Sequence, residues 1–431
     1  MLFNIIQCLI LLISVSSRVS FEDHQVWEVY IQKQEEANTL HQLEHLALID
    51  IWNTVHQGMV QFSVSKTKQS KVDRMLKRSH LKYHVKIDNL QDSIDQQIYA
   101  NNMIDTKPFD NTIPKSSDPD HYLSKYHTIE EIYDYMDSLI LAYPHLIEPF
   151  EIGQSYEKRP IRGIKIHVKN STVIHPKEYL FHGSIHAREW IGPAMLQYLA
   201  TTFLIEYGKD DVITQLLNDN SFDIIPVFNV DGYAFSHNEN RMWRKNRVPT
   251  NFFCIGTDIN RNWDYSWGRP GASSNPCSDA YYGAKPFSAP ETTAISNYIL
   301  SRSPHLIAYI DFHAYGLLWM YPFGDDCNKH AKTESDLHRV GNVASKAVKN
   351  VHGTAFKVGS ICRIIYQASG NSVDWAYTKG GVPFTYGIEL RDTGSYGFLL
   401  PPKFIVPSGE EMVAGVIAMS QEITKISMQN K

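Results

Sequence analysis

Residues 179–193 read YLFHGSIHAREWIGP, and the interpretation of the whole chain starts from this stretch. An apolar run is followed by polar residues and then by a segment whose pattern is typical of a helix. Open α/β sheets place their chemistry where a strand ends in this way and passes into a helix. His186 and Glu189 are three positions apart, so a turn entering a helix can point both to one side. A surface turn with incidental charges is the alternative.

Two more strand-like runs end in residues that are useful for catalysis. An imidazole and a carboxylate on one side of a turn are two of the three protein ligands of a catalytic zinc site. His313 closes the run LIAYIDFH, and Glu389 lies at the end of PFTYGIEL. A histidine from a distant strand would complete the metal set and leave one position open for water. Taken alone, His313 is more commonly a buried core histidine than a metal ligand. Taken alone, Glu389 is more commonly an ion-pair partner of Arg391 than a catalytic base.

The composition is that of an ordinary globular chain with more than one domain. The 431 residues are 43% hydrophobic and 20% charged, and the formal net charge is -5. The chain lacks the excess of basic residues that a nucleic-acid-binding protein would show. Beyond the N-terminus, no stretch is apolar enough to cross a membrane, so we expect neither nucleic acid nor a membrane as a partner.

Residues 1–20 are expected to be a secretory signal peptide, which predicts an extracellular protein. Their apolar run is followed by small residues, although the usual basic residues at the start are missing. An uncleaved anchor is the alternative. Loss of this segment removes Cys8 and leaves an even number of cysteines, as suits an oxidising compartment. The remaining four allow three pairings, which spacing does not decide: they are Cys254, Cys277, Cys327 and Cys362.

Residues 21–103 are expected to form a small domain of their own. Strand-like runs at 25–31, 59–65 and 81–87 alternate with helical segments, the last of which covers 88–103. Strands and helices in turn over so few residues favour a small α+β sandwich, which we expect to be ferredoxin-like.

Residues 104–118 have the composition of an exposed connector. Pro108 and Pro114 interrupt them, and polar residues fill most other positions. Lys107 and Lys115 would be accessible to a trypsin-like protease. A plain interdomain linker is the alternative. A signal segment, a small domain and a cleavable connector ahead of the main domain together indicate a secreted zymogen.

Residues 119–431 are expected to form one large α/β domain, with a mixed twisted β-sheet flanked by helices. Capping boxes are predicted at three helix starts, by Thr128 with Glu131, by Ser288 with Glu291 and by Ser408 with Glu411. The predicted strands cover residues 162–168, 178–183, 221–229, 306–313 and 383–390.

A loop region of this domain is rich in arginine and asparagine. It contains Arg244 and then the run DINRNW at 258–263. Because a guanidinium pairs with a carboxylate through two hydrogen bonds, this region could hold the carboxylate end of a ligand. A solvated surface is the alternative.

Six motifs follow one another along about residues 120–430. They are HAREWIGP from residue 186, ENRMWRKNR from 239, DINRNWD from 258, FHAYGLLWMYPFG from 312, IYQASGNSVDWAY from 365 and IELRDTGSYGFLLP from 388. In these motifs, and in their order and spacing, the sequence resembles the zinc metallocarboxypeptidases of the carboxypeptidase A/B type, including their secreted proenzymes. The resemblance implies one Zn²⁺ per chain and a monomer that acts on the C-termini of peptides and proteins.

The resemblance also implies the catalytic roles. It assigns zinc to His186, Glu189 and His313, a ligand set that belongs to the family. It makes Glu389 the general base that acts on a zinc-bound water and then shuttles the proton. It makes Arg244 the cation that stabilises the oxyanion.

Substrate binding follows from the same motifs. A buried clamp for a free carboxylate explains exopeptidase action, because an internal peptide bond would leave the clamp unpaired. The resemblance implies carboxylate binding by Asn260, Arg261 and Tyr366, substrate contacts by Arg188 and Tyr315, and orientation of His186 by Asp258.

The pocket for the C-terminal side chain separates A-type from B-type enzymes. In the family, an Asp at its base favours Lys or Arg, and the matching residue here is Val373. Gly324 and Ile361 are further pocket positions, and none is acidic. Burial of a cationic substrate side chain in this apolar pocket would therefore cost roughly several kcal/mol of desolvation free energy. We expect release of aliphatic or aromatic residues, with the small Gly387 leaving room for a large ring.

Two alternatives to this function stay open at this point. One is B-like specificity for C-terminal Lys or Arg, and the other is a non-catalytic relative that only binds C-terminal peptides. For the cysteines, the resemblance implies the pairs Cys254–Cys277 and, as in only some family members, Cys327–Cys362.

Overall fold

The computed structural model describes residues 18–53, 58–106, 119–169 and 176–429. Nearly all of the predicted signal segment lies outside these ranges, as do Lys107 and Lys115 of the predicted connector. In the part of the chain that is described, no helix has both the length and the apolar character needed to span a membrane.

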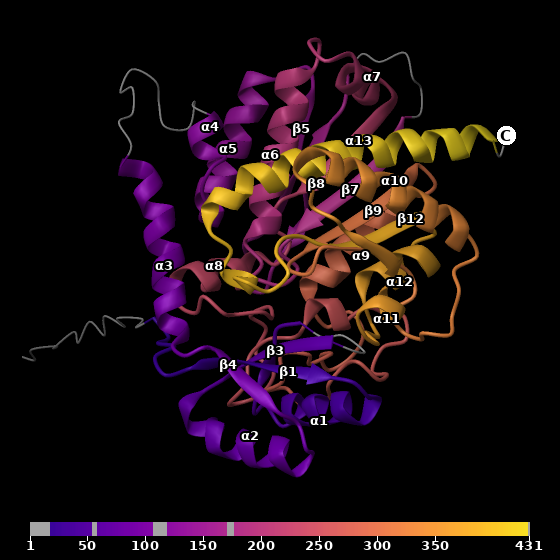
Figure 1. Cartoon of the computed structure of the whole chain (residues 1–431). Helices are drawn as coiled ribbons and strands as arrows, with labels where there is room; N and C mark the ends of the chain where they lie inside the picture. Colours follow the sequence, from indigo (N-terminus) through magenta and orange to yellow (C-terminus); the bar gives the residue numbers. More distant parts are fainter. Residues whose placement is uncertain (1–17, 54–57, 107–118, 170–175, 430–431) are drawn as a thin grey trace, which may run out of the picture.

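The N-terminal unit, β1 to α3, is a four-stranded antiparallel sheet with helices (Figure 1). Its strands are ordered β2-β3-β1-β4. One face of β1 packs on α1 and α2, with Trp27 in a small separate core, while Val26 on the other face joins the main core. The elements are β1 (Gln25–Ile31), α1 (Gln34–His45), β2 (Asp50–Ile51), β3 (Gly58–Val64), α2 (Lys66–Arg78), β4 (Tyr83–Ile87) and α3 (Leu90–Asn102).

The C-terminal domain, α4 to α13, is built on an eight-stranded mixed sheet. Its order is β11-β10-β12-β9-β7-β8-β6-β5. The neighbours β12, β9, β7 and β8 run parallel, so their carboxyl ends share one edge of the sheet. The strands are β5 (Ile147–Gln154), β6 (Pro160–Ile166), β7 (Lys177–Gly183), β8 (Asn220–Ile225), β9 (Leu306–His313), β10 (Leu318–Tyr321), β11 (Lys357–Ser360) and β12 (Phe384–Glu389).

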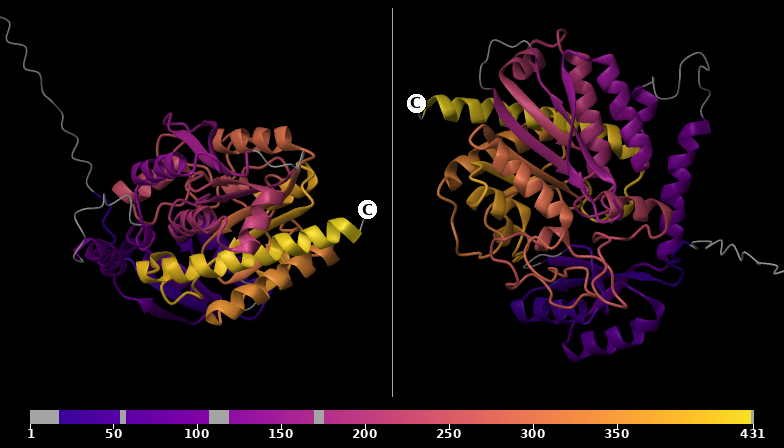
Figure 2. Two further views of the ribbon diagram at one scale, coloured as in Figure 1. Left: turned by 90° about the horizontal axis from the view of Figure 1, so that it is seen from above. Right: turned by 180° about the vertical axis from the view of Figure 1, so that it is seen from behind.

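Helices cover both faces of this sheet, which confirms the predicted fold class. The long α13 crosses one face and packs against α6 and α10, while α9 lies on the other face (Figure 2). The helices are α4 (Pro119–Tyr122), α5 (Ile129–Ala142), α6 (Ile191–Glu206), α7 (Asp211–Asp219), α8 (Val230–Asn238), α9 (Pro290–Arg302), α10 (Glu334–His352), α11 (Ile361–Ile364), α12 (Ser372–Thr378) and α13 (Ile405–Gln429).

One predicted capping box is confirmed and the other two are wrong. Ser408 lies inside α13, where its Oγ donates to the Phe404 carbonyl at 2.7 Å. Thr128 Oγ1 accepts from the Glu131 amide at 3.3 Å, and Glu131 Oε2 accepts from the Thr128 amide at 2.9 Å. In contrast, α9 begins without a side-chain cap at Ser288. Glu291 is buried instead and accepts a hydrogen bond from Asn246 at 2.9 Å. Burial raises the pKa of Glu291 to about 7.

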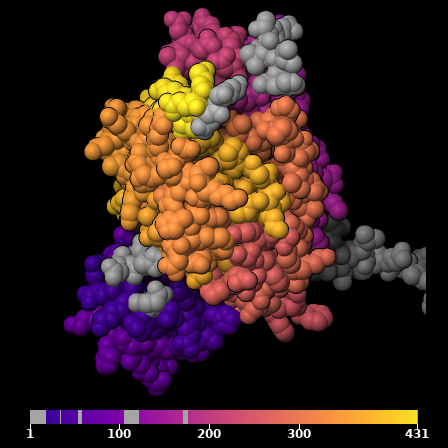
Figure 3. Space-filling model, turned by 90° about the vertical axis from the view of Figure 1, so that its right-hand side faces the viewer, coloured from indigo at the N-terminus to yellow at the C-terminus, as the bar shows by residue number. Residues whose placement is uncertain are grey.

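The N-terminal unit covers the edge of the sheet at which the parallel strands end (Figure 1). Figure 3 shows it packed directly against the C-terminal domain. The contacts are specific as well as apolar: Gln97 donates to the Leu400 carbonyl at 2.9 Å and accepts from Arg241 at 2.9 Å. Any chemistry at this edge therefore takes place beneath the N-terminal unit.

Candidate metal centre and substrate cleft

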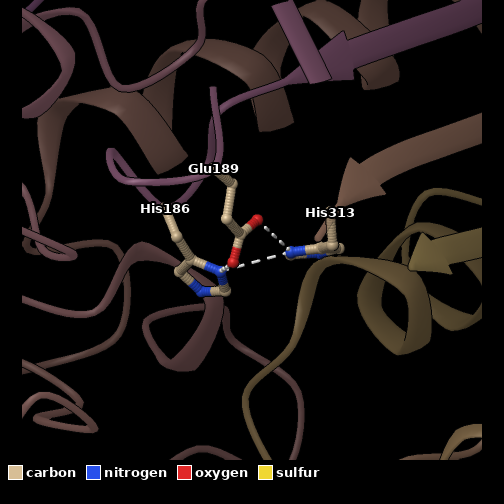
Figure 4. Close-up of side chains that lie close together, drawn as sticks. All are labelled: His186, Glu189 and His313. Carbon is tan, nitrogen blue, oxygen red and sulfur yellow. Dashed lines mark hydrogen bonds and ion pairs between the residues drawn. The ribbon is translucent and has the colours of Figure 1, made fainter. Parts of the chain in front are cut away.

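Three side chains converge at the carboxyl edge of the sheet (Figure 4). His186 and Glu189 lie in the turn between β7 and α6, and His313 is the last residue of β9. His186 Nδ1 is 2.7 Å from Glu189 Oε1, and His313 Nδ1 is 3.1 Å from Glu189 Oε2. All three residues are buried. Among the described residues, this is the group whose donor atoms lie close enough together to hold a metal ion.

The donor set fits zinc. His186 Nδ1 and His313 Nδ1 are 3.2 Å apart. Two ligands of a tetrahedral zinc ion with metal–nitrogen bonds of about 2.0–2.1 Å are separated by about 3.3 Å. Two imidazole nitrogens and a carboxylate direct their lone pairs to one point, where a dication would balance the negative charge. All three residues line the cleft, so a metal held by them would be accessible from it.

A carboxylate lies behind each histidine. Asp258 Oδ1 is 3.3 Å from His186 Nε2, and Asp311 Oδ2 is 3.0 Å from His313 Nε2. Such partners fix which ring nitrogen carries the proton. The sequence motifs predict the role of Asp258, whereas Asp311 was not predicted. The signal was available, because residues two apart on a strand share a face and Asp311 precedes His313 by two.

Asp258 also holds the arginine of the site. Arg244 Nε and Nη2 lie 3.2 and 2.9 Å from Asp258 Oδ2, and Arg244 lines the cleft. The carboxylate raises the pKa of Arg244 far above its ordinary value in spite of burial, so the guanidinium stays charged. A fixed cation next to the candidate metal-binding residues can stabilise developing negative charge.

Glu389 ends β12, directly beside β9, and its register partner is His313. Burial raises the pKa of Glu389 to about 8. Its Oε2 has no hydrogen-bond partner among the described residues. The alternative pairing with Arg391 is not formed, because Arg391 binds Glu411. A half-buried carboxyl group whose Oε2 is enclosed and unpaired, beside the candidate metal-binding residues, is suited to proton transfer.

The predicted carboxylate clamp comes together on one side of the cleft. Arg261 Nη2 donates to Tyr366 Oη at 2.7 Å, and its Nη1 donates to the Asn260 carbonyl at 2.8 Å. Asn260 Oδ1 accepts from the Ser372 amide at 2.9 Å, which fixes the Asn260 side chain. Asn260, Arg261 and Tyr366 all line the cleft.

An apolar pocket lies next to this clamp. Val373 and Ile361 belong to a cluster of buried apolar side chains. A Cβ placed on Gly387 would be 3.5 Å from Val373 Cγ2, so the glycine leaves space. The neighbouring acid Asp374 does not serve the pocket, because its carboxylate accepts from the Gly324 amide at 2.9 Å.

Gly324 itself lies behind the pocket wall and does not line the cleft. A Cβ at this position would meet Asn371 Nδ2 at 2.8 Å and Ile361 Cγ2 at 3.0 Å. The absence of a side chain thus lets the backbone pass close behind the wall. Two disulfides brace the surrounding loops, Cys254–Cys277 and Cys327–Cys362.

The cleft has a volume of about 780 Å³ and is roofed by residues of α1 and β2. Arg188 is fully buried and points away from the cleft to the N-terminal unit. Its two terminal nitrogens lie 2.6 and 3.0 Å from the carboxylate of Asp50. Tyr315 Oη donates to Gln61 of the same unit at 2.6 Å. Both residues predicted to contact substrate are therefore held by the N-terminal unit.

Comparisons with known proteins agree with this geometry. The model of the zinc carboxypeptidase family matches residues 132–415, and the model of the carboxypeptidase activation peptide matches residues 27–97. The chain is 39% identical over 410 residues to carboxypeptidase A2 of Mus musculus, covering 94% of each chain. It is 35% identical over 421 residues to carboxypeptidase A1 of Bos taurus, covering 96% of each.

Solved structures show the same fold. Thrombin activatable fibrinolysis inhibitor superposes with a TM-score of 0.81 at 32% identity, covering 94% of this chain and 100% of the other. Carboxypeptidase A from Helicoverpa armigera gives a TM-score of 0.85 at 26% identity, covering 95% and 99%. The chain therefore belongs to the zinc carboxypeptidase family, as a metallocarboxypeptidase with one Zn²⁺ per chain and its own activation peptide.

Proposed function

We propose that the chain is a secreted, monomeric proenzyme that removes aliphatic or aromatic residues from the C-termini of peptides and proteins. The observation that carries this proposal is the apolar pocket around Val373, which lies beside both the zinc ligands and the carboxylate clamp. The names of the relatives, carboxypeptidases A1 and A2, support an A-like preference over a B-like one.

In this proposal, His186, Glu189 and His313 hold zinc. When bound, zinc supplies a Lewis acid that polarises the scissile carbonyl and makes water more acidic. Glu389 takes the proton from the attacking water and passes it to the leaving amine. Arg244, kept charged by Asp258, stabilises the negative charge that develops on the carbonyl oxygen.

Asn260, Arg261 and Tyr366 bind the terminal carboxylate of the substrate. The guanidinium of Arg261 is held by the Asn260 carbonyl and by Tyr366, so its position is set before substrate arrives. An internal peptide bond brings no carboxylate and leaves this charge unpaired, which restricts the enzyme to chain ends. Val373, Ile361 and, from behind, Gly324 shape the pocket for the released side chain.

We also assign the segments of the chain. Residues 1–20 are the signal peptide, 21–103 the activation domain, 104–118 a connector cut by a trypsin-like protease, and 119–431 the enzyme. The proposal is supported by the roof that the N-terminal unit forms over the cleft and by the ends of the two family matches.

Limited digestion tests this function. The full-length protein should hydrolyse a peptide with C-terminal Phe only slowly, and trypsin should release an activity that a zinc chelator removes and added Zn²⁺ restores. Carboxyl-terminal products are identified by mass spectrometry. Full activity in the uncut chain would overturn the zymogen assignment, and activity that resists the chelator would overturn the zinc assignment.

Asp50→Asn should loosen the N-terminal unit from the enzyme. The change removes the carboxylate that pairs with the buried guanidinium of Arg188, and breaking a buried ion pair typically costs about 3–5 kcal/mol. We therefore expect measurable activity in the uncut variant and faster activation by trypsin. The matched control is Asp73→Asn, which removes an ion pair with Lys77 on α2. Equal latency in both variants would show that Asp50 does not hold the unit in place.

A further inference from the structure

Strand β9 presents a row of polar side chains on one face. Tyr309, Asp311 and His313 are separated by two positions each, so they point the same way. All three are buried, and Tyr309 and Asp311 are completely so. On the neighbouring strand β7, His182 is the register partner of Asp311 and is also completely buried. The row thus begins at a proposed zinc ligand and runs into the sheet.

Every member of the row contacts the next. Asp311 Oδ2 is 3.0 Å from His313 Nε2 and accepts from Ser372 Oγ at 2.6 Å. Asp311 Oδ1 faces His182 Nδ1 at 3.5 Å, and neither of these two atoms has a hydrogen bond elsewhere among the described residues. His182 Nε2 is 2.6 Å from Tyr309 Oη.

The protons on His313 follow from its neighbours. Its Nδ1 faces the other zinc ligands and must offer a lone pair there, so the proton is on Nε2. The Asn260 amide nitrogen, 3.3 Å from Nε2, only donates. Asp311 is therefore the group that can accept this proton in a hydrogen bond.

The protons on His182 follow in the same way. Burial lowers the pKa of His182 to about 4, so the ring is neutral and carries one proton. Because a hydroxyl donates readily to an imidazole nitrogen, Tyr309 occupies Nε2 and leaves the proton on Nδ1. That proton faces the free oxygen of Asp311.

We propose that Asp311 is a positioning residue for His313, and that His182, itself set by Tyr309, fixes the orientation of the Asp311 carboxylate. The row sets the affinity of the site for zinc by locking the tautomer and the ring plane of His313. The inference rests on the proposed zinc site. Loss of a carboxylate behind a metal-binding histidine typically lowers metal affinity about 10- to 100-fold.

The test is the zinc dissociation constant of the full-length chain, measured by competition with a chromophoric chelator, together with the visible spectrum of the cobalt-substituted protein. Asp311→Asn should weaken zinc binding about 10- to 100-fold and shift the cobalt bands. Tyr309→Phe keeps the ring and removes one hydrogen bond, so we expect a loss of about 2- to 10-fold. The control is Tyr386→Phe on β12, which deletes a buried hydroxyl that donates to the Leu337 carbonyl of α10.

Each outcome has a distinct meaning. Wild-type zinc affinity and an unchanged cobalt spectrum in Asp311→Asn would overturn the inference. If that variant does not fold, wild-type values in Tyr309→Phe would overturn the role of the row. An equal loss of zinc affinity in Tyr386→Phe would show a general packing effect and would also overturn the role of the row. A wild-type chain that binds no zinc would overturn the proposed function itself.

Discussion

Replacement of Glu389 by glutamine is expected to abolish hydrolysis while zinc and peptide binding persist. Glutamine matches the shape of the carboxyl group but cannot take a proton from water or pass one to the leaving amine. General acid–base groups typically contribute about 100- to 10,000-fold in rate, and here one group would serve both steps. The measurement is kcat on a peptide with C-terminal Phe after trypsin treatment.

Binding measurements complete this test. The trypsin-treated variant should hold one zinc ion, measured by metal analysis, and should bind the uncleaved peptide in calorimetry. Glu411→Gln is a matched control, because Glu411 is a buried carboxylate that pairs with Arg391 away from the cleft. A variant at Glu389 that turns over at the wild-type rate would exclude it as the general base.

The pH profile provides an independent test of the same residue. Glu389 must be unprotonated to act as a base, so kcat/KM should fall as the pH drops through its pKa. Burial raises the pKa of Glu389 to about 8, and a nearby metal dication lowers a carboxyl pKa. The acid limb should therefore lie below pH 8 in the zinc-loaded enzyme. An acid limb above that value would contradict this assignment.

Val373→Asp is expected to change the preference of the enzyme from Phe to Lys. At present a lysine ammonium would enter an apolar pocket with no counter-charge, whereas the new carboxylate would pair with it. A missing partner for a buried charge typically costs about 3–5 kcal/mol, which corresponds to a change of about 100-fold or more in the ratio of kcat/KM for Lys and Phe. Matched peptides that differ only in the last residue give this ratio.

Val373→Asn separates charge from size in this experiment. Asparagine has the shape of aspartate without its charge, so it should reduce hydrolysis of the Phe peptide without creating activity on Lys. A wild-type chain that already prefers Lys would refute the proposed A-like specificity. A Val373→Asp variant that still prefers Phe would show that this position does not decide the pocket.

Several strands could be predicted from sequence because their signal is local. LIAYIDFH at 306–313 is a continuous apolar run with polar residues at its end, and β9 has those same bounds. The run 221–229 was predicted too long, since β8 ends at Ile225. Pro226 follows, and proline has no amide proton for the ladder. The short strand β10 was not predicted, because four residues carry too little periodicity.

The site was harder to complete from sequence than the strands were. Motifs pointed to all three metal-binding candidates, because His186 and Glu189 lie in one motif and His313 lies in another. Asp50 was missed because its partner Arg188 is 138 residues away in the chain, and nothing in the local pattern links them. The capping box at Ser288 failed because Glu291 is turned into the core, where tertiary contacts outweigh the local preference.

The single carboxylate of Asp258 also has a consequence for reading natural or engineered variants. One of its oxygens faces the proposed zinc ligand His186 and the other binds Arg244. Substitutions at these three positions share a partner, so their energetic effects will not add. A sequence change at Arg244 that looks harmless in one background can be severe in another, and the three positions are best considered as one epistatic unit.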